Sequence, residues 1–157
     1  MRQLQDVRVF NHIAPVSLQN GSGAIANDID TLGYGGGDLL IICTLGVTGG
    51  TFTALKVQES DDDSSYSDVS GTTVGTSTDI DGAATDLPDG TGDDAGTYIF
   101  HIPLTESRKR YFNVVATANN DGAMLFSCSA VLAAAGKVSV TDLTDASPAD
   151  NTILRGS

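Results

Sequence analysis

Short stretches in which apolar and polar side chains alternate are the feature that most constrains this chain. One runs over 97–104, with Tyr98, Phe100 and Ile102 on one face, and another runs over 123–135. A period of two places successive side chains on opposite faces of a β-strand. No stretch shows the 3.6-residue period of an amphipathic helix. The sequence therefore predicts an all-β chain.

Further strands follow from the same pattern. An apolar run over 38–45 ends at Gly46 and is typical of a strand covered on both faces. Alternation predicts strands over 51–59, 66–69 and 108–118. Several short strands separated by turn residues are typical of an antiparallel β-sandwich, of which the jelly roll is one form. We therefore predict a sandwich, with the jelly roll as the specific version to test.

The domain organisation follows from length and from the weak pattern at both ends. The 157 residues suffice for one domain and are too few for two. We assign 21–140 to the sandwich, 1–20 to an N-terminal arm and 141–157 to a C-terminal arm. The stretch 70–97 is poor in bulky apolar residues, so we expect a long surface excursion or a partly mobile segment.

Charge excludes one class of partner. The chain has 20 acidic and 8 basic residues, for a net charge of −12, whereas nucleic-acid binding requires a basic surface. No apolar run reaches the roughly 18 residues of a membrane-spanning helix, and the first residues do not resemble a signal peptide. We expect no nucleic-acid or membrane partner. Cys43 and Cys128 each fall in a predicted core strand, which favours buried free thiols in a reducing cytoplasm and leaves a disulfide as the alternative.

Catalytic and metal-binding patterns are weak. Asp79-Ile80-Asp81-Gly82 departs from the calcium-loop spacing because the glycine comes two places too early and no glutamate follows. His12 and His101 have no nucleophile motif nearby. We therefore predict no enzymatic activity, no cofactor and no metal site, and leave open whether 61–94 hold a cation.

One basic patch stands out on this acidic chain: Arg108, Lys109 and Arg110 are consecutive and precede Tyr111. One interpretation is a strand start whose charges face solvent and neighbouring aspartates. The other is an electrostatic contact with an acidic protein or with a second copy of the chain.

Three segments carry motifs that occur together: Ile29-Asp30-Thr31-Leu32-Gly33-Tyr34 leading into 39–44, residues 54–62 with 66–69, and Arg108-Lys109-Arg110-Tyr111 with 114–118. With these motifs the chain resembles small virion proteins of tailed bacteriophages, over roughly residues 12–135. These proteins share an Ile-Asp-Thr-x-Gly-Tyr lead before the first core strand, a hairpin with an Asp-Asp-Gly-Ser turn, and a later strand. Here Asp63 stands where the glycine of that turn usually stands.

The resemblance implies a structural protein of the virion, most specifically a capsid decoration or cement protein on the outer capsid surface, assembled in the host cytoplasm. Its partner would be the major capsid protein, and a homotrimer is the expected assembly. Two alternatives stay open: a tail, neck or head-fibre component, and a carbohydrate-binding, adhesin-like module that uses 70–97. The residues predicted to contact the capsid or another subunit are Val7, Arg8, Val9, Phe10, Arg108, Lys109, Arg110, Val138, Val140, Ile153 and Leu154.

Overall fold

The computed structural model describes residues 7–18, 23, 26, 28–90, 95–119, 122–135 and 151–157. Every named element in these residues is a β-strand, which confirms the all-β prediction. The strands are β1 (Val7–Leu18), β2 (Ile29–Asp30), β3 (Asp38–Thr48), β4 (Phe52–Ser60), β5 (Ser67–Asp68), β6 (Thr97–Pro103), β7 (Tyr111–Ala118), β8 (Met124–Ala133) and β9 (Asn151–Arg155).

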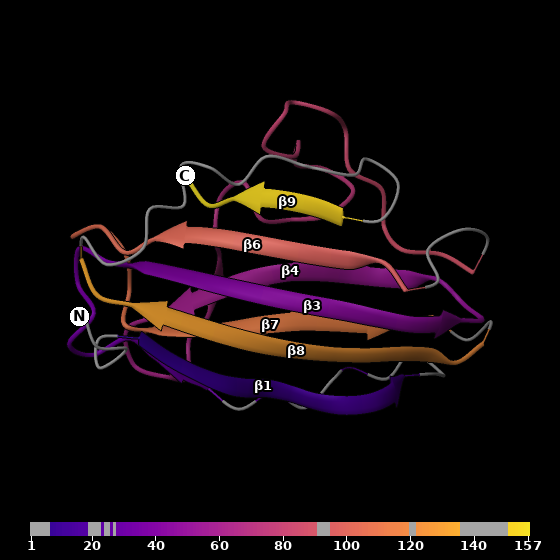
Figure 1. Ribbon diagram of the computed structural model, residues 1–157, viewed down its shortest axis with the longest axis horizontal. Coiled ribbons are helices and arrows are strands. Elements are labelled where there is room, and N and C mark those ends of the chain that lie inside the picture. Colours follow the sequence, from indigo (N-terminus) through magenta and orange to yellow (C-terminus); the bar gives the residue numbers. More distant parts are fainter. Residues whose placement is uncertain are drawn as a thin grey trace, which may run out of the picture.

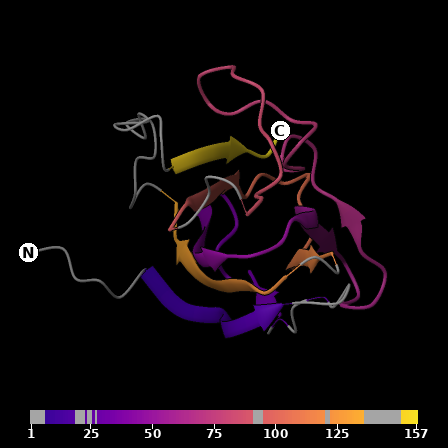
Figure 2. The same ribbon diagram turned by 90° about the vertical axis from the view of Figure 1, so that its right-hand side faces the viewer.

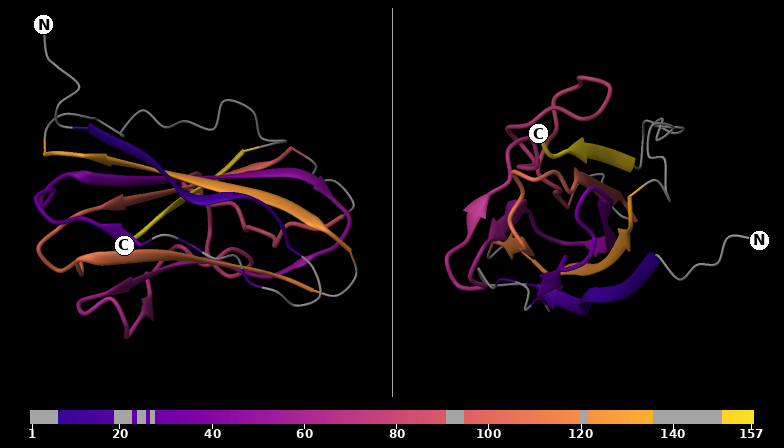
Figure 3. Two further views of the ribbon diagram at one scale, coloured as in Figure 1. Left: turned by 90° about the horizontal axis from the view of Figure 1, so that it is seen from below. Right: turned by 90° about the vertical axis from the view of Figure 1, so that its left-hand side faces the viewer.

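The described strands form two sheets packed face to face, which confirms the β-sandwich (Figures 1 and 3). Sheet A has the order β1-β8-β3-β6-β9, and sheet B has the order β2-β7-β4-β5. Their strand pairs are antiparallel except β6 and β9, which run parallel. Sheet A faces the viewer in Figure 1, with β1 at the bottom and β9 at the top.

Alternating burial places the core between the sheets. In β3, Leu39, Ile41 and Cys43 are buried, whereas Leu40 and Ile42 are half-buried on the outer face. The strand predicted over 38–45 is therefore confirmed, but only its inner face is fully covered. Burying one such aliphatic side chain contributes about 1.5–3 kcal/mol, so the inner face contributes most of the stabilisation.

A β-bulge changes the face assignments in β4. The pairing with β7 shifts register between Phe52 and Ala54. Phe52 and Leu55 are consequently both buried, although strict alternation over 51–59 places them on opposite faces. The Phe52 ring packs edge-on against Phe126 of sheet A, with ring centroids 5.4 Å apart. The bulge thus contributes an aromatic contact that joins the two sheets.

The predicted terminal arms need a correction. Val7–Leu18 is not a free arm, because it pairs with β8 as an edge strand of sheet A. Asn151–Arg155 pairs with β6 at the opposite edge. Both segments gain backbone hydrogen bonds and apolar burial that a free arm lacks. Within the predicted arms, 1–6, 19–20 and 141–150 lie outside the described residues.

The connection between β5 and β6 closes over β9, as Figure 2 shows. The amide of Ile80 donates to the carbonyl of Ile153 at 2.8 Å, and the amide of Ser157 donates to the carbonyl of Ser70 at 3.0 Å. Gly71 has a φ of +80°, and a β-carbon there would lie 2.4 Å from the Arg155 carbonyl oxygen. The predicted surface excursion over 70–97 is therefore anchored over 70–90, and its residues 91–94 lie outside the described part of the chain.

Candidate functional site

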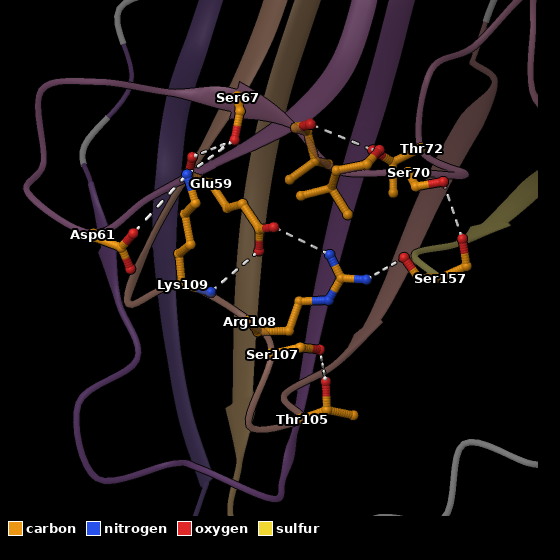
Figure 4. Close-up of polar contacts among 12 residues, drawn as sticks. Glu59, Asp61, Ser67, Ser70, Thr72, Thr105, Ser107, Arg108, Lys109 and Ser157 are labelled. Carbon is orange, nitrogen blue, oxygen red and sulfur yellow. Dashed lines mark hydrogen bonds and ion pairs between the residues drawn. The ribbon is translucent and has the colours of Figure 1, made fainter.

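The basic patch lies in the connection between β6 and β7, and its arginines already have partners within the chain. Arg108 Nη1 donates to Glu59 Oε1 at 3.3 Å, and Arg108 also donates to the carbonyl oxygen of Ser157 (Figure 4). The side chains of Arg108 and Glu59 are each only 11 % exposed. Arg108 therefore joins sheet B to the residues that follow β9.

Arg110 and Lys109 complete this pattern. Arg110 binds Asp30 with two parallel hydrogen bonds, Nε to Oδ1 at 2.8 Å and Nη2 to Oδ2 at 2.7 Å. The hydrogen bonds from Arg110 lower the pKa of Asp30, because they stabilise its ionised form. Lys109 Nζ donates to Ser67 Oγ at 3.1 Å and lies 4.0 Å from Asp61 Oδ2. These contacts support the interpretation in which the basic charges face neighbouring acidic groups.

A hollow of about 340 Å³ lies beside this patch. Thr31, Leu32 and Gly33 line it together with the basic residues. An anion that entered would compete with Asp30, Glu59 and Asp61 for the same cations. The contact with an acidic partner remains a prediction on this geometry.

The acidic loops show turn chemistry. Asp62 Oδ1 accepts hydrogen bonds from Ser60 Oγ at 2.8 Å, from the amide of Ser64 at 3.0 Å and from the amide of Ser65 at 2.8 Å. These bonds, the one from Ser65 first, lower the pKa of Asp62. Asp79 Oδ1 similarly accepts from two amides in its own loop. Among the described residues, no group of three or more acidic, histidine or cysteine side chains is arranged to hold a metal ion.

The two histidines occupy buried positions with different partners. His12 Nε2 accepts a hydrogen bond from the amide of Val114 at 3.0 Å, so this side chain of β1 satisfies an amide of β7 in sheet B. His101 Nε2 lies 2.7 Å from Asp38 Oδ1. In a catalytic triad, a carboxylate orients the histidine that activates the nucleophile, so this pair supplies two of the three groups. In the described part of the chain, however, His101 Nδ1 has no hydrogen-bond partner that would serve as the nucleophile.

The two cysteines meet in the core, although 85 positions separate them. Cys43 of β3 is the register partner of Cys128 of β8, and their Sγ atoms lie 3.3 Å apart. Both are free thiols, as the sequence predicts. Burial is the main reason why the pKa of the Cys43 thiol is raised. Sequence spacing alone contained no signal for this contact, because it depends on which strands become neighbours.

Four exposed apolar residues lie on β1 and on the adjoining β8, and we call them the β1 surface: Val9, Pro15, Val16 and Leu125. Val9 is 67 % exposed and Leu125 is 44 % exposed. Beside Pro15, Val16 and Leu125 lies a hollow of about 370 Å³. Arg8 is the one formally charged residue in Val7–Leu18. Sheet A thus ends in an apolar, non-acidic edge on a strongly acidic chain.

The predicted contact residues fall into separate places. Val7, Arg8, Val9 and Phe10 lie on β1, at the edge of sheet A opposite to β9. Ile153 and Leu154 on β9 are buried within their own domain, which corrects their assignment as contact residues for a neighbour. Val138 and Val140 lie outside the described residues. The structure brings Arg108 to the end of β9 but does not bring β1 and β9 together.

Two further findings bear on function. Among the described residues, there is no helix that is both long enough and apolar enough to cross a membrane. Comparison with protein-family models, with curated proteins and with solved structures gives no match for this chain.

Proposed function

We propose that this chain is a non-enzymatic structural protein of a tailed-bacteriophage virion, which decorates the outer capsid surface and stabilises contacts between capsomers. The observation that carries the proposal is the β1 surface. Interface cores are depleted in charged residues, and an edge strand offers unpaired backbone groups to a neighbouring protein. In the described residues, the outer edge of β1 has no strand partner, and it carries the exposed Val9.

The order of the strands supports this proposal. The pairs β1·β8, β2·β7, β3·β6 and β4·β5 are nested one inside the other along the chain. We classify this nested pairing as a jelly roll, to which β9 is added as an extra strand. The jelly-roll architecture recurs in viral capsid and lectin domains. The sequence motifs that resemble virion proteins favour a viral structural protein over a lectin.

The mechanism of stabilisation is mass action. A protein that binds the assembled shell and not its separated subunits lowers the free energy of the shell by RT ln(1 + [L]/Kd) per site. At a free concentration one hundred times Kd this amounts to about 2.7 kcal/mol per site. No chemical step is needed for this function. The net charge of −12 keeps the chain from binding packaged DNA.

Particles that lack the chain provide the decisive test. We expect such capsids to release their genome at a lower temperature than complete capsids, and purified chain added back to restore the difference. Intact heads without tails would instead assign the chain to the tail or neck. Particles that are identical with and without the chain would contradict both assignments.

A matched pair of variants tests the β1 surface itself. Val9→Asp adds a charge at a residue that is 67 % exposed on β1, and Leu32→Asp makes the same change at a residue that is 68 % exposed beside the basic patch. We expect Val9→Asp to lose cosedimentation with capsids and Leu32→Asp to retain it. The opposite result would move the contact to the basic patch.

The carbohydrate-binding alternative has one supporting observation. A hollow of about 500 Å³ lies between the 70–90 segment and β9, where Thr76, Ser77, Asp79 and Arg155 line it with polar groups. Such groups match the hydroxyls of a sugar. Binding of the purified chain to a glycan array, lost in Arg155→Ala, would support this alternative over the decoration role.

The oligomeric state is part of the proposal. Repeated binding sites on a symmetric shell favour a cyclic assembly, and we propose a trimer. Sedimentation equilibrium of the purified chain measures this directly. A monomer at all concentrations would contradict a preformed trimer.

A further inference from the structure

Cys43 and Cys128 are the chemically reactive pair that the proposed function does not use. They lie directly opposite each other on β3 and β8, with Sγ atoms 3.3 Å apart. Cys43 is 0 % exposed and Cys128 is 1 % exposed. The sequence favours two buried free thiols and leaves a disulfide between them as the alternative, and the sheet order places them side by side as a dithiol.

We propose that Cys43 and Cys128 form a latent cross-strand disulfide, which closes by exchange with a small disulfide such as oxidised glutathione. Directly opposite residues in antiparallel strands have Cα atoms about 4.5 or 5.5 Å apart. A disulfide requires a Cα separation of about 4.4–6.8 Å, so both kinds of pair satisfy it. Closure needs the two Sγ atoms to approach from 3.3 Å to about 2.05 Å. Small rotations of the two side chains supply this movement without a change in strand pairing.

The exchange proceeds in two balanced steps. One cysteine, as its thiolate, attacks a sulfur of oxidised glutathione, and a protein–glutathione disulfide forms while one glutathione thiolate leaves. The second cysteine thiolate then attacks the protein sulfur of that mixed disulfide, and the second glutathione leaves. Two cysteine thiols are oxidised and one glutathione disulfide is reduced to two glutathione molecules. The protons released by the cysteines are taken up by the glutathione thiolates.

Burial makes this closure slow in the folded protein. The thiolate is the reacting species, and the raised pKa of Cys43 keeps it protonated near neutral pH. The interior of sheet A also excludes a tripeptide reagent, so reaction requires transient opening between β3 and β8. The dithiol is therefore protected in the folded chain and reacts at the rate at which the sheet opens. Denaturant below the unfolding midpoint accelerates the reaction for the same reason.

Closure increases stability because it restricts the unfolded chain. The bond would join positions 85 residues apart, so it closes a long loop in the unfolded chain and removes the conformational entropy of that loop's open states. For a chain of this size, a disulfide with the usual stabilising effect raises Tm by about 5–15 °C. The bond also fixes β8 to β3, which lie in the middle of sheet A.

The test uses the full chain, purified in reductant and then incubated with oxidised glutathione in urea just below the unfolding midpoint. Remaining thiols are blocked with N-ethylmaleimide before mass spectrometry. We expect a monomer that is 2 Da lighter and takes up no N-ethylmaleimide, with one cross-linked peptide pair containing Cys43 and Cys128. Its Tm should exceed that of the reduced chain, and dithiothreitol should reverse the shift. Stable glutathione adducts, disulfide-linked dimers or a lower Tm would overturn the proposal.

Two single variants are the controls, Cys43→Ala and Cys128→Ala. Each retains one thiol, so each should end as a glutathione adduct or a dimer and gain no thermal stability from oxidation. An equal rise in Tm in either variant would show that oxidation acts elsewhere. If one variant does not fold, the mass and Tm of the oxidised wild-type chain still decide the question. The test uses purified protein, so its outcome does not depend on the proposed role in a virion.

Discussion

The two edges of sheet A, β1 and β9, come from segments with similarly weak sequence patterns and have opposite environments. β9 pairs with β6, and Leu154 is fully buried in the core. β1 pairs with β8, but in the described part of the chain its outer edge has no strand partner and Val9 projects into solvent. One of these strands completes the core, and the other presents an exposed edge.

The difference arises from what covers each edge. Ile80 hydrogen-bonds to Ile153 of β9, and Ser70 and Arg108 both hydrogen-bond to Ser157, two places after the strand. On β1, the buried His12 connects the strand to β7, while Arg8 stacks on the ring of Phe10 in the same strand. An edge with a covering segment becomes part of the core, whereas an edge without one remains available for association.

The largest expected effect is at Leu154. Leu154→Ala removes a fully buried side chain from β9 and should cost about 2–5 kcal/mol of unfolding free energy, measured by urea denaturation. Leu125→Ala on β8 makes the same change at a residue that is 44 % exposed, and it should cost about 1 kcal/mol. Equal losses would show that β9 is not part of the core.

The next effect tests the segment that covers β9. Gly71→Ala places a side chain at a positive φ and against the Arg155 carbonyl. It should lower the free energy of unfolding by about 2–3 kcal/mol. Gly82→Ala is the matched control, because its φ is +87° but nothing lies within 4 Å of the added carbon. We expect the control to lose about 1 kcal/mol of unfolding free energy. If thermal unfolding shows the same loss for both, the close contact with β9 does not form.

A smaller loss of stability is expected at Arg108, and Arg8 is its control. Arg108→Met removes the partner of the buried Glu59 carboxylate and should cost about 1–2 kcal/mol in urea denaturation. Arg8→Met on β1 should stay within about 0.5 kcal/mol, because Arg8 is exposed. A larger loss for Arg8 than for Arg108 would contradict the contrast between the two edges.

The smallest expected effect is at Val9. Val9→Thr keeps the shape and the β-propensity of the side chain, and it should change unfolding free energy by less than about 0.5 kcal/mol. A loss above about 1 kcal/mol would mean that Val9 is covered within the single chain. The β1 surface would then lose its main support as a docking site.

The strands with long regular alternation were predicted closely. Stretches 97–104, 108–118 and 123–135 correspond to β6, β7 and β8, with boundaries that differ by no more than three residues. The bulge at Phe52 was missed, because an extra residue in one strand leaves the composition of the segment unchanged. The parallel pairing of β9 was missed too, since Ile153 and Leu154 form an apolar pair too short to show a period.

The candidate site was predicted only in part. Arg108, Lys109 and Arg110 were visible as a basic run, but their partners Asp30 and Glu59 lie far from them in the chain. Contact between Cys43 and Cys128 was left as an open alternative, because it depends on β3 and β8 becoming neighbours with one particular register. Periodicity specifies which face of a strand is apolar and contains no information about which strand lies beside it.

Local properties of the chain determined the all-β class, most strand positions and the acidic, turn-rich loops, because side-chain period and turn chemistry act over a few residues. Sheet order, the bulge, the coverage of β9 and the exposure of β1 were decided by the tertiary structure. These features depend on contacts between residues that are tens of positions apart, and such contacts form only when the two sheets pack and the apolar faces compete for the same core.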